Sequence, residues 1–320
     1  MKPARAAALI FLIAGLAAFS LRAEQSAADE TVLPEPPLLI NPFYLEQFVL
    51  HVQGLYEDSG VPGLAVALIQ ADGTMALFKF GVRDLESGEP INLRTLWALD
   101  SVTQPLTSFL VARGVSEGEL DWDRPARRLG DFSLWTPEDT EAVTLRHLLG
   151  MSAGVPALLD ETLTQVEARP GVNLEAGDLF SALSQMPLLY APGKGFEESR
   201  ASFAAGGYLA AAELAGGGKT GFAAYRQALS THLWEPLQME GGFFSPRLVQ
   251  ASGNYARGYA TRPDGGFDPA EWPEANLALA PAEGLWLSLV DTALWLRTEL
   301  LGGIQRVERD EDGAVTQVIR

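Results

Sequence analysis

The chain has 320 residues, a formal net charge of −18 at pH 7 and an isoelectric point near 4.5. This acidity argues against binding to nucleic acid or to anionic membrane surfaces, because both repel a negative protein. The absence of cysteine excludes a disulfide framework, a thiolate metal site and a lipid-modified N-terminal cysteine.

The first residues have the pattern of a secretory signal peptide, residues 1–23. Lys2 and Arg5 precede an apolar stretch over residues 6–19, and Ala23 is a suitable cleavage point. An uncleaved anchor is the alternative, but the apolar stretch is shorter than the roughly 20 residues of a membrane span. We therefore expect a periplasmic or secreted protein with no transmembrane span after signal removal.

A Pro-rich tether is expected over residues 24–42, followed by one domain over 43–320. Apolar residues at helical spacing predict an amphipathic helix over 43–58. Two apolar runs, 63–70 and 75–82, flank a turn signal and predict a β-hairpin.

The rest of the chain is expected to be mainly helical until its last residues. Thr144 is a suitable N-cap for a short helix, and the tail over 305–320 alternates around an Asp-Gly pair, which predicts a hairpin. The predicted helices after the first hairpin cover residues 102–114, 145–149, 203–214, 223–237 and 282–301.

Ser101 begins the predicted buried helix in a pattern that resembles a nucleophile motif. Penicillin-recognising serine hydrolases use S-x-x-K at such a helix start. Residues three apart share one helix face, so the lysine amine reaches the serine hydroxyl and acts as its base. The helix N-terminus also favours a developing oxyanion. Here the fourth residue is Gln104, and a carboxamide is not a base near neutral pH.

The surrounding residues resemble the serine β-lactamase-related family, which includes class C β-lactamases, DD-peptidases and related esterases. The resemblance covers roughly residues 43–301. It is carried by Val61-Pro62-Gly63-Leu64-Ala65-Val66-Ala67, Gly81-Val82-Arg83-Asp84, Thr95-Leu96-Trp97-Ala98, Ser101-Val102-Thr103-Gln104-Pro105 and Thr144-Leu145-Arg146-His147-Leu148-Leu149.

The resemblance implies an α/β (α+β) fold of the β-lactamase/transpeptidase type. Its mixed, mainly antiparallel sheet is flanked by helices and interrupted by a helical region over about 85–240. Ser101 is expected at the floor of a cleft between the two parts. Truncation of the C-terminal strands is left open.

The second family motif, Y-x-N, is also altered. The run Pro192-Gly193-Lys194-Gly195-Phe196-Glu197-Glu198-Ser199-Arg200 places Glu198 at the Tyr position and Arg200 at the Asn position. The resemblance thus puts Gln104, Glu198 and Arg200 around Ser101. One interpretation is that Glu198 and Arg200 form an ion pair that plugs a dead pocket. The other makes Glu198 a replacement base for Ser101, although Arg200 would lower the pKa of that carboxyl.

The third family motif, K-T-G or H-T-G, is not found at its expected place. Lys219-Thr220-Gly221 has the right letters but falls between two predicted helices, whereas the family motif follows the last helix. The residues after Leu301 contain no such string. We therefore expect the strand that supplies part of the oxyanion hole to be missing.

Other chemical motifs are judged by their context. The Gly-rich run at 216–220 lacks the first glycine and the preceding strand of a phosphate loop. Ser152 lies in a literal G-x-S-x-G, but a predicted helix precedes it where a strand is required. His51, His147 and His232 lack ligand spacing, and Asp310-Glu311-Asp312-Gly313 is a charged turn rather than a calcium loop. No metal and no cofactor are expected.

Two functions follow from this sequence. The first is a catalytically inactive exported relative, a pseudoenzyme that binds a peptidoglycan fragment or a protein partner. The alternative is a slow serine hydrolase, an esterase, amidase or DD-peptidase-like enzyme, that uses Ser101 with an unconventional base such as Glu198. The contacts among Ser101, Gln104 and Glu198 discriminate between them.

Overall fold

The computed structural model describes residues 42–70, 73–167, 173–218, 220–272, 276–303, 306–309 and 315–319. The expected signal peptide, nearly all of the tether, Lys219 and the turn at 310–313 therefore lie outside the described residues. Within the described residues, no helix is both long enough and apolar enough to span a membrane.

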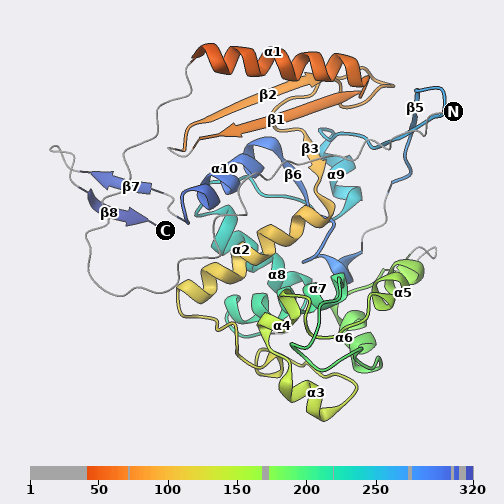
Figure 1. The fold of residues 1–320 in the computed structure, drawn as a ribbon, viewed down its shortest axis with the longest axis vertical. Helices are drawn as coiled ribbons and strands as arrows, with labels where there is room; N and C mark the ends of the chain where they lie inside the picture. The colour runs from red at the N-terminus through yellow and green to blue at the C-terminus, as the bar shows by residue number, and fades with distance from the viewer. Residues whose placement is uncertain are drawn as a thin grey trace. The chain divides into compact units, whose positions relative to one another are not determined.

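The first elements form a helix-covered hairpin, as the sequence predicts. Helix α1 (Pro42–Ser59) precedes strands β1 (Gly63–Ile69) and β2 (Met75–Gly81), which pair antiparallel from Gly63↔Gly81 to Ile69↔Met75. Tyr56 of α1 stacks on Phe80 of β2. Helix α10 (Leu289–Leu300) contacts both strands, and Figure 1 shows it on the side of the hairpin away from α1.

The helical part is built around two buried helices, α2 (Thr103–Ser116) and α7 (Arg200–Leu214), which contact each other. Small side chains allow α7 to be enclosed almost completely. Figure 1 shows α3–α6 grouped beside α7. The other helices are α3 (Pro137–Ala142), α4 (Leu145–Leu149), α5 (Leu158–Glu167), α6 (Ala176–Ser184), α8 (Phe222–Leu229) and α9 (Pro246–Ser252). Short turns of other helix types are η1 (Asp100–Val102), η2 (Ala126–Arg128), η3 (Ser230–Trp234) and η4 (Leu277–Leu279).

The strands of the described residues form four antiparallel pairs. Beside β1–β2, the pairs are β3 (Leu96–Ala98) with β6 (Trp286–Ser288), β4 (Tyr259–Thr261) with β5 (Phe267–Pro269), and β7 (Arg306–Arg309) with β8 (Val315–Ile319). The mixed α/β class with antiparallel pairing is as expected, including the C-terminal hairpin. The expected single main sheet is present as separate pairs within this part of the chain.

Several predicted helix boundaries were wrong, and the helix expected over 203–214 begins earlier, at Arg200. The helix expected over 282–301 begins only at Leu289, because Ser288 caps it by accepting a hydrogen bond from Asp291 N at 3.1 Å and residues 286–288 pair with β3. The helix expected over 223–237 changes into the π-helical turn η3 after Leu229. Ser101 lies in the tight turn η1, just before α2 begins.

A buried hydrogen-bond network fixes α2 against distant segments. Thr107 Oγ1 of α2 donates to Pro281 O at 2.7 Å. The same oxygen is 2.6 Å from the hydroxyl of Tyr225 in α8, which must then be the donor. Burial of the Tyr225 ring raises the pKa of its hydroxyl, which keeps the phenol protonated. Three segments far apart in the sequence thus share one hydroxyl.

Thr107→Val is expected to lower the free energy of unfolding by about 1–3 kcal/mol, because it leaves Pro281 O and the Tyr225 hydroxyl buried without their partner. Urea denaturation measures the change. Thr162→Val, which removes an exposed hydroxyl in α5, is the matched control and should change stability by less than about 0.5 kcal/mol. Equal stability of Thr107→Val and the native chain would contradict this role.

Two buried carboxylates hold helix starts. Asp160 of α5 accepts hydrogen bonds from Arg200 N at 2.7 Å and Ala201 N at 2.8 Å, the first residues of α7. Asp291 accepts from Glu240 N at 2.9 Å and from Ser288 Oγ at 2.8 Å. Burial raises the pKa of both carboxyls above the ordinary value of 3.8, although these hydrogen bonds act in the opposite direction.

The stability contributed by these two groups is expected to fall as pH rises above about 4. In that window the folded chain binds more protons than the unfolded chain, so raising the pH favours unfolding. Melting temperatures from about pH 4 to about pH 7 should fall less steeply for Asp160→Asn and for Asp291→Asn than for the native chain. Glu161→Gln, an exposed carboxylate on the same helix as Asp160, is the control. Native slopes in both Asn variants would refute the assignment.

Candidate functional site

Ser101 is presented on the surface by a strained turn. Strand β3 pairs with β6, and Leu99 N donates to Leu285 O at 2.8 Å, so the chain is held just before the turn η1. Asp100 then has a φ of +46°, in the left-handed region that non-glycine residues rarely adopt. Such a conformation costs about 1–3 kcal/mol and tends to occur at functional sites. Ser101 itself is exposed, directly before α2.

No candidate base forms a hydrogen bond with the Ser101 side chain in the part of the chain that the structure describes. Gln104 is partly buried in the first turn of α2, and Glu198 is exposed in the segment before α7. Among the described residues, no hydrogen bond joins Ser101 Oγ to either side chain. The sequence places these three residues at matching motif positions, but they form no hydrogen-bonded catalytic unit.

Arg200 is held by carboxylates other than the expected one. Its guanidinium donates to Glu283 Oε2 at 2.5 Å, and its Nε lies 3.8 Å from Asp160 Oδ2. The predicted Glu198–Arg200 ion pair was therefore wrong. Asp160 accepts a hydrogen bond from the backbone N–H of Arg200, the first residue of α7, and so lies beside the side chain of that residue.

A cavity of about 330 Å³ lies beside this group. Its polar lining residues include two acidic ones, Asp100 and Glu283, and Asn276, whose Oδ1 is buried without a hydrogen-bond partner among the described residues. Burial raises the pKa of Glu283, opposed by its hydrogen bond to Arg200. Apolar walls are supplied by Ala98, Phe244, Pro246 and Trp286. The cavity is therefore suited to a ligand that brings hydrogen-bond donors or positive charge.

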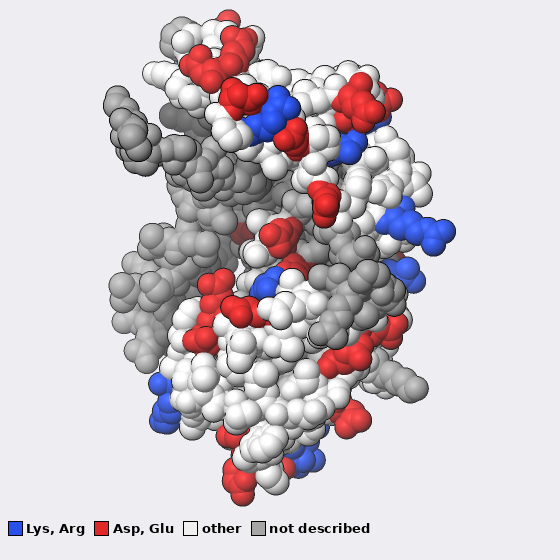
Figure 2. Space-filling view, turned by 90° about the vertical axis from the view of Figure 1, so that its right-hand side faces the viewer, with Lys and Arg blue, Asp and Glu red and all other residues white. Residues whose placement is uncertain are grey.

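A larger cavity, of about 890 Å³, lies elsewhere. Neither Ser101 nor Arg200 is among the lining residues of either cavity. It is lined by both signs of charge, among them Arg94, Arg226, Glu240 and Asp291. On the face drawn in Figure 2, Asp and Glu side chains are widely spread and Lys and Arg are fewer, in keeping with the net charge of the chain.

Ser152 is in a structural loop rather than a nucleophile turn. The helix α4 precedes it, where an esterase elbow requires a strand. Ser152 N donates to His147 O at 2.9 Å, and Ser152 O accepts from Gly193 N at 2.8 Å. This residue therefore joins α4 to the loop that leads to Glu198.

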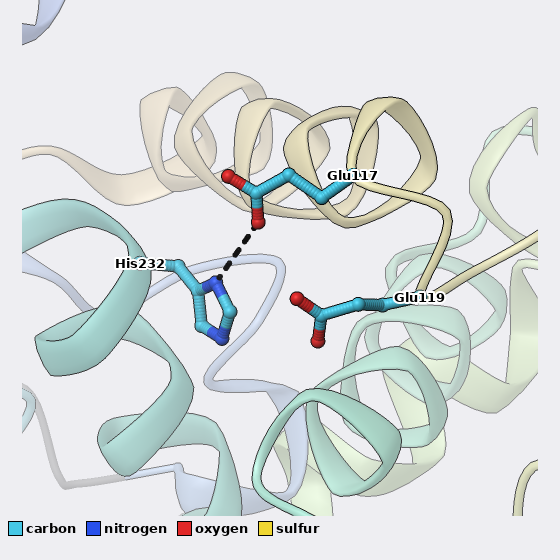
Figure 3. A group of neighbouring side chains, drawn as sticks. All are labelled: Glu117, Glu119 and His232. Carbon is cyan, nitrogen blue, oxygen red and sulfur yellow. Dashed lines mark ion pairs between the residues drawn. The ribbon is translucent and has the colours of Figure 1, made fainter. Parts of the chain in front are cut away.

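One cluster was missed in the sequence. Glu117 and Glu119, directly after α2, lie beside His232 of η3, and one ligand atom from each is within 4.8 Å of the others. Figure 3 shows both carboxylates directed at the imidazole. The three residues are far apart along the chain, so no spacing rule could join them. The pair of glutamates around Gly118 at a helix end was the available local signal.

Comparison with known proteins gives the family. The Beta-lactamase family model matches residues 48–317. The esterase EstB of Burkholderia gladioli is 35% identical over 147 residues, which are 43% of this chain and 38% of the esterase. A β-lactamase of Escherichia coli (strain K12) is 25% identical over 246 residues, 77% of this chain and 58% of that protein. The chain thus spans less than two thirds of the length of these relatives.

A solved structure shows the same fold. The octameric penicillin-binding protein homologue from Pyrococcus abyssi superposes with a TM-score of 0.61 at 20% identity, covering 85% of this chain and 62% of that one. The family model also covers most of the sequence, including Ser101, Glu198 and Arg200. This chain belongs to the β-lactamase family of serine hydrolase-like proteins.

Proposed function

We propose that this chain is a catalytically inactive member of its family, a pseudoenzyme that acts as an exported binding module. The observation that carries the proposal is the isolation of Ser101. The residue at the lysine position is Gln104, which cannot accept a proton near neutral pH, and no described side chain replaces it at hydrogen-bond distance.

The rate enhancement that a general base normally provides is large, and its loss supports the proposal. A positioned general base contributes about 10²–10⁴ in rate. The second motif offers no substitute, because Glu198 is exposed and Arg200 is engaged with Glu283 and Asp160. What remains next to Ser101 is the cavity of about 330 Å³ that Asp100 lines, and such a cavity can bind a ligand.

The residues that line the cavity of about 330 Å³ favour a ligand with an ammonium group. Asp100, Glu283 and Asn276, each of which carries hydrogen-bond acceptors, line this space together with Trp286. An ammonium group satisfies such acceptors and is attracted to an indole face. A peptidoglycan fragment with a free amino group on its peptide has this chemistry, and the signal-like residues 1–23 are consistent with export to the compartment where it occurs.

A second candidate function, slow serine hydrolysis, is favoured by one observation. The left-handed Asp100 and the exposed Ser101 keep the strained presentation of a nucleophile at a helix start. A relative of this kind would hydrolyse esters or amides slowly through Ser101, with a base such as Glu198 moving into reach when substrate binds.

Covalent labelling tests the two candidates. The purified chain is treated with a fluorescent penicillin and with a fluorophosphonate, and intact mass is measured. We expect less than about 1% of the labelling rate of an active relative, because the base is absent. Ser101→Ala is the nucleophile control, and Ser152→Ala is the matched control at the other serine motif.

Labelling of the native chain that disappears in Ser101→Ala and persists in Ser152→Ala would overturn the pseudoenzyme proposal in favour of slow hydrolysis. Gln104→Lys, run in parallel, restores the family base at its position. Gain of labelling in this variant would show that loss of the lysine alone silences the site.

The acceptor cavity predicts a dependence on ligand charge. A muramyl peptide with a free lysine amine should bind several-fold more tightly than its N-acetylated form, as measured by calorimetry. Asp100→Asn, which keeps a residue tolerant of left-handed backbone, should reduce that preference. Asp264→Asn, in an exposed turn, should not. Equal affinity of the native chain for both peptides would exclude a cation-binding cavity.

A further inference from the structure

The two glutamates after α2 are placed by a tight helix end. Gly118 N donates to Val115 O at 3.1 Å, and Glu119 N donates to Gly114 O at 2.9 Å, the hydrogen bonds of a Schellman turn. Gly118 has a φ of +79°, which glycine adopts without strain. The reversal at Gly118 brings the side chains of Glu117 and Glu119 to the same place instead of opposite sides of the helix.

His232 meets them from a different part of the chain. It lies in η3, a π-helical turn. Such turns are rare in proteins, and those that are found are frequently at functional sites. The side chain is buried, with the residue 8% exposed. Its Nε2 is 3.4 Å from Leu214 O, which can only accept, so a hydrogen bond here places a proton on Nε2.

The other ring nitrogen, Nδ1, is then the atom available to a metal ion, and the ring lies beside the two carboxylates. Glu117 Oε2 lies 3.8 Å from Nδ1, beyond hydrogen-bond distance, and no other hydrogen bond reaches Nδ1 within the described residues. Figure 3 shows the ring and both carboxylates converging on one small space. Three residues that can each offer a metal-ligating atom therefore face each other.

Two carboxylates and one guanidinium, that of Arg113, meet at this space. Arg113 binds Glu117 Oε1 at 2.9 Å through Nε and His232 O at 2.7 Å through Nη1, so one carboxylate oxygen is already engaged. Glu117 Oε2 and the Glu119 carboxylate remain. Both also lie at the C-terminal end of α2, where the helix dipole disfavours negative charge. A cation at this point removes both penalties.

We propose that His232, Glu117 and Glu119 bind a divalent cation, with Zn²⁺ as the ion that the donor set fits best. One imidazole and two carboxylates are ligands that zinc accepts, with its fourth position left to water. The Nε2–H to carbonyl hydrogen bond is the usual support of a metal-bound histidine. Ca²⁺ and Mg²⁺ prefer six or more oxygen ligands. The inference is independent of the function proposed for Ser101.

The bound ion would cross-link two segments of the fold. It joins the end of α2 to η3. These two segments are also linked by the hydrogen bond from Arg113 to His232 O. Because the folded chain assembles the three ligands from distant parts of the sequence, the unfolded chain has no such site. Binding therefore stabilises the fold by mass action.

Equilibrium dialysis of the metal-stripped full chain against ZnCl₂, with metal quantified by mass spectrometry, tests the site. One zinc ion per chain is expected. His232→Ala and Glu119→Gln should each weaken binding by at least about tenfold. His51→Ala, which removes an exposed histidine of α1, should leave affinity unchanged. ZnCl₂ should raise the melting temperature of the native chain and of His51→Ala.

Glu119→Gln keeps the test valid if His232→Ala, at a buried position, does not fold, since Glu119 is exposed. Equal zinc affinity of the native chain and Glu119→Gln, or no zinc uptake by the native chain, would overturn the proposal. Tighter binding of CaCl₂ than of ZnCl₂ would overturn the assignment to zinc.

Discussion

The hydroxyl of Thr107 is the constraint on which the arrangement of the helical part depends. A polar group in the middle of a buried helix must be paired, because a lost partner costs more than the hydrogen bond contributes. Here the partners are Tyr225 in α8 and Pro281 O shortly before β6. The strand β6 in turn pairs with β3, which leads into η1. One buried hydroxyl thus helps determine where Ser101 is presented.

Ion pairs of Arg200 with Asp160 and Glu283 determine the arrangement at the start of α7. Asp160 satisfies the backbone at the start of α7, and Arg200 is the first residue there, so the guanidinium is drawn to Asp160 and on to Glu283. Asp100 is also close enough to influence Arg200 and Glu283 electrostatically. The carboxylates of Asp100, Asp160 and Glu283 therefore outnumber the one guanidinium, that of Arg200. The cavity is accordingly negative in a chain that is already acidic.

Local patterns predicted the elements well and the contacts poorly. The helix-and-hairpin start, Thr144 as a cap and the C-terminal hairpin all follow from residue spacing and turn chemistry, which act over a few residues. The late start of α10 did not follow, because the pairing of β6 with β3 removes residues that carry a helical pattern. Glu283 as the partner of Arg200, and His232 beside Glu117 and Glu119, depend on tertiary contacts that no local pattern encodes.

Helix α2 also separates the two candidate sites by a known length. Its 14 residues at about 1.5 Å each give an axis of about 21 Å between the turn with Ser101 and the glutamates beyond its other end. The Debye length at physiological ionic strength is about 8 Å, so the charge of an ion at one end is screened before it reaches the other. Displacement of the helix as a rigid rod would couple the two ends mechanically, and such coupling would persist at high salt.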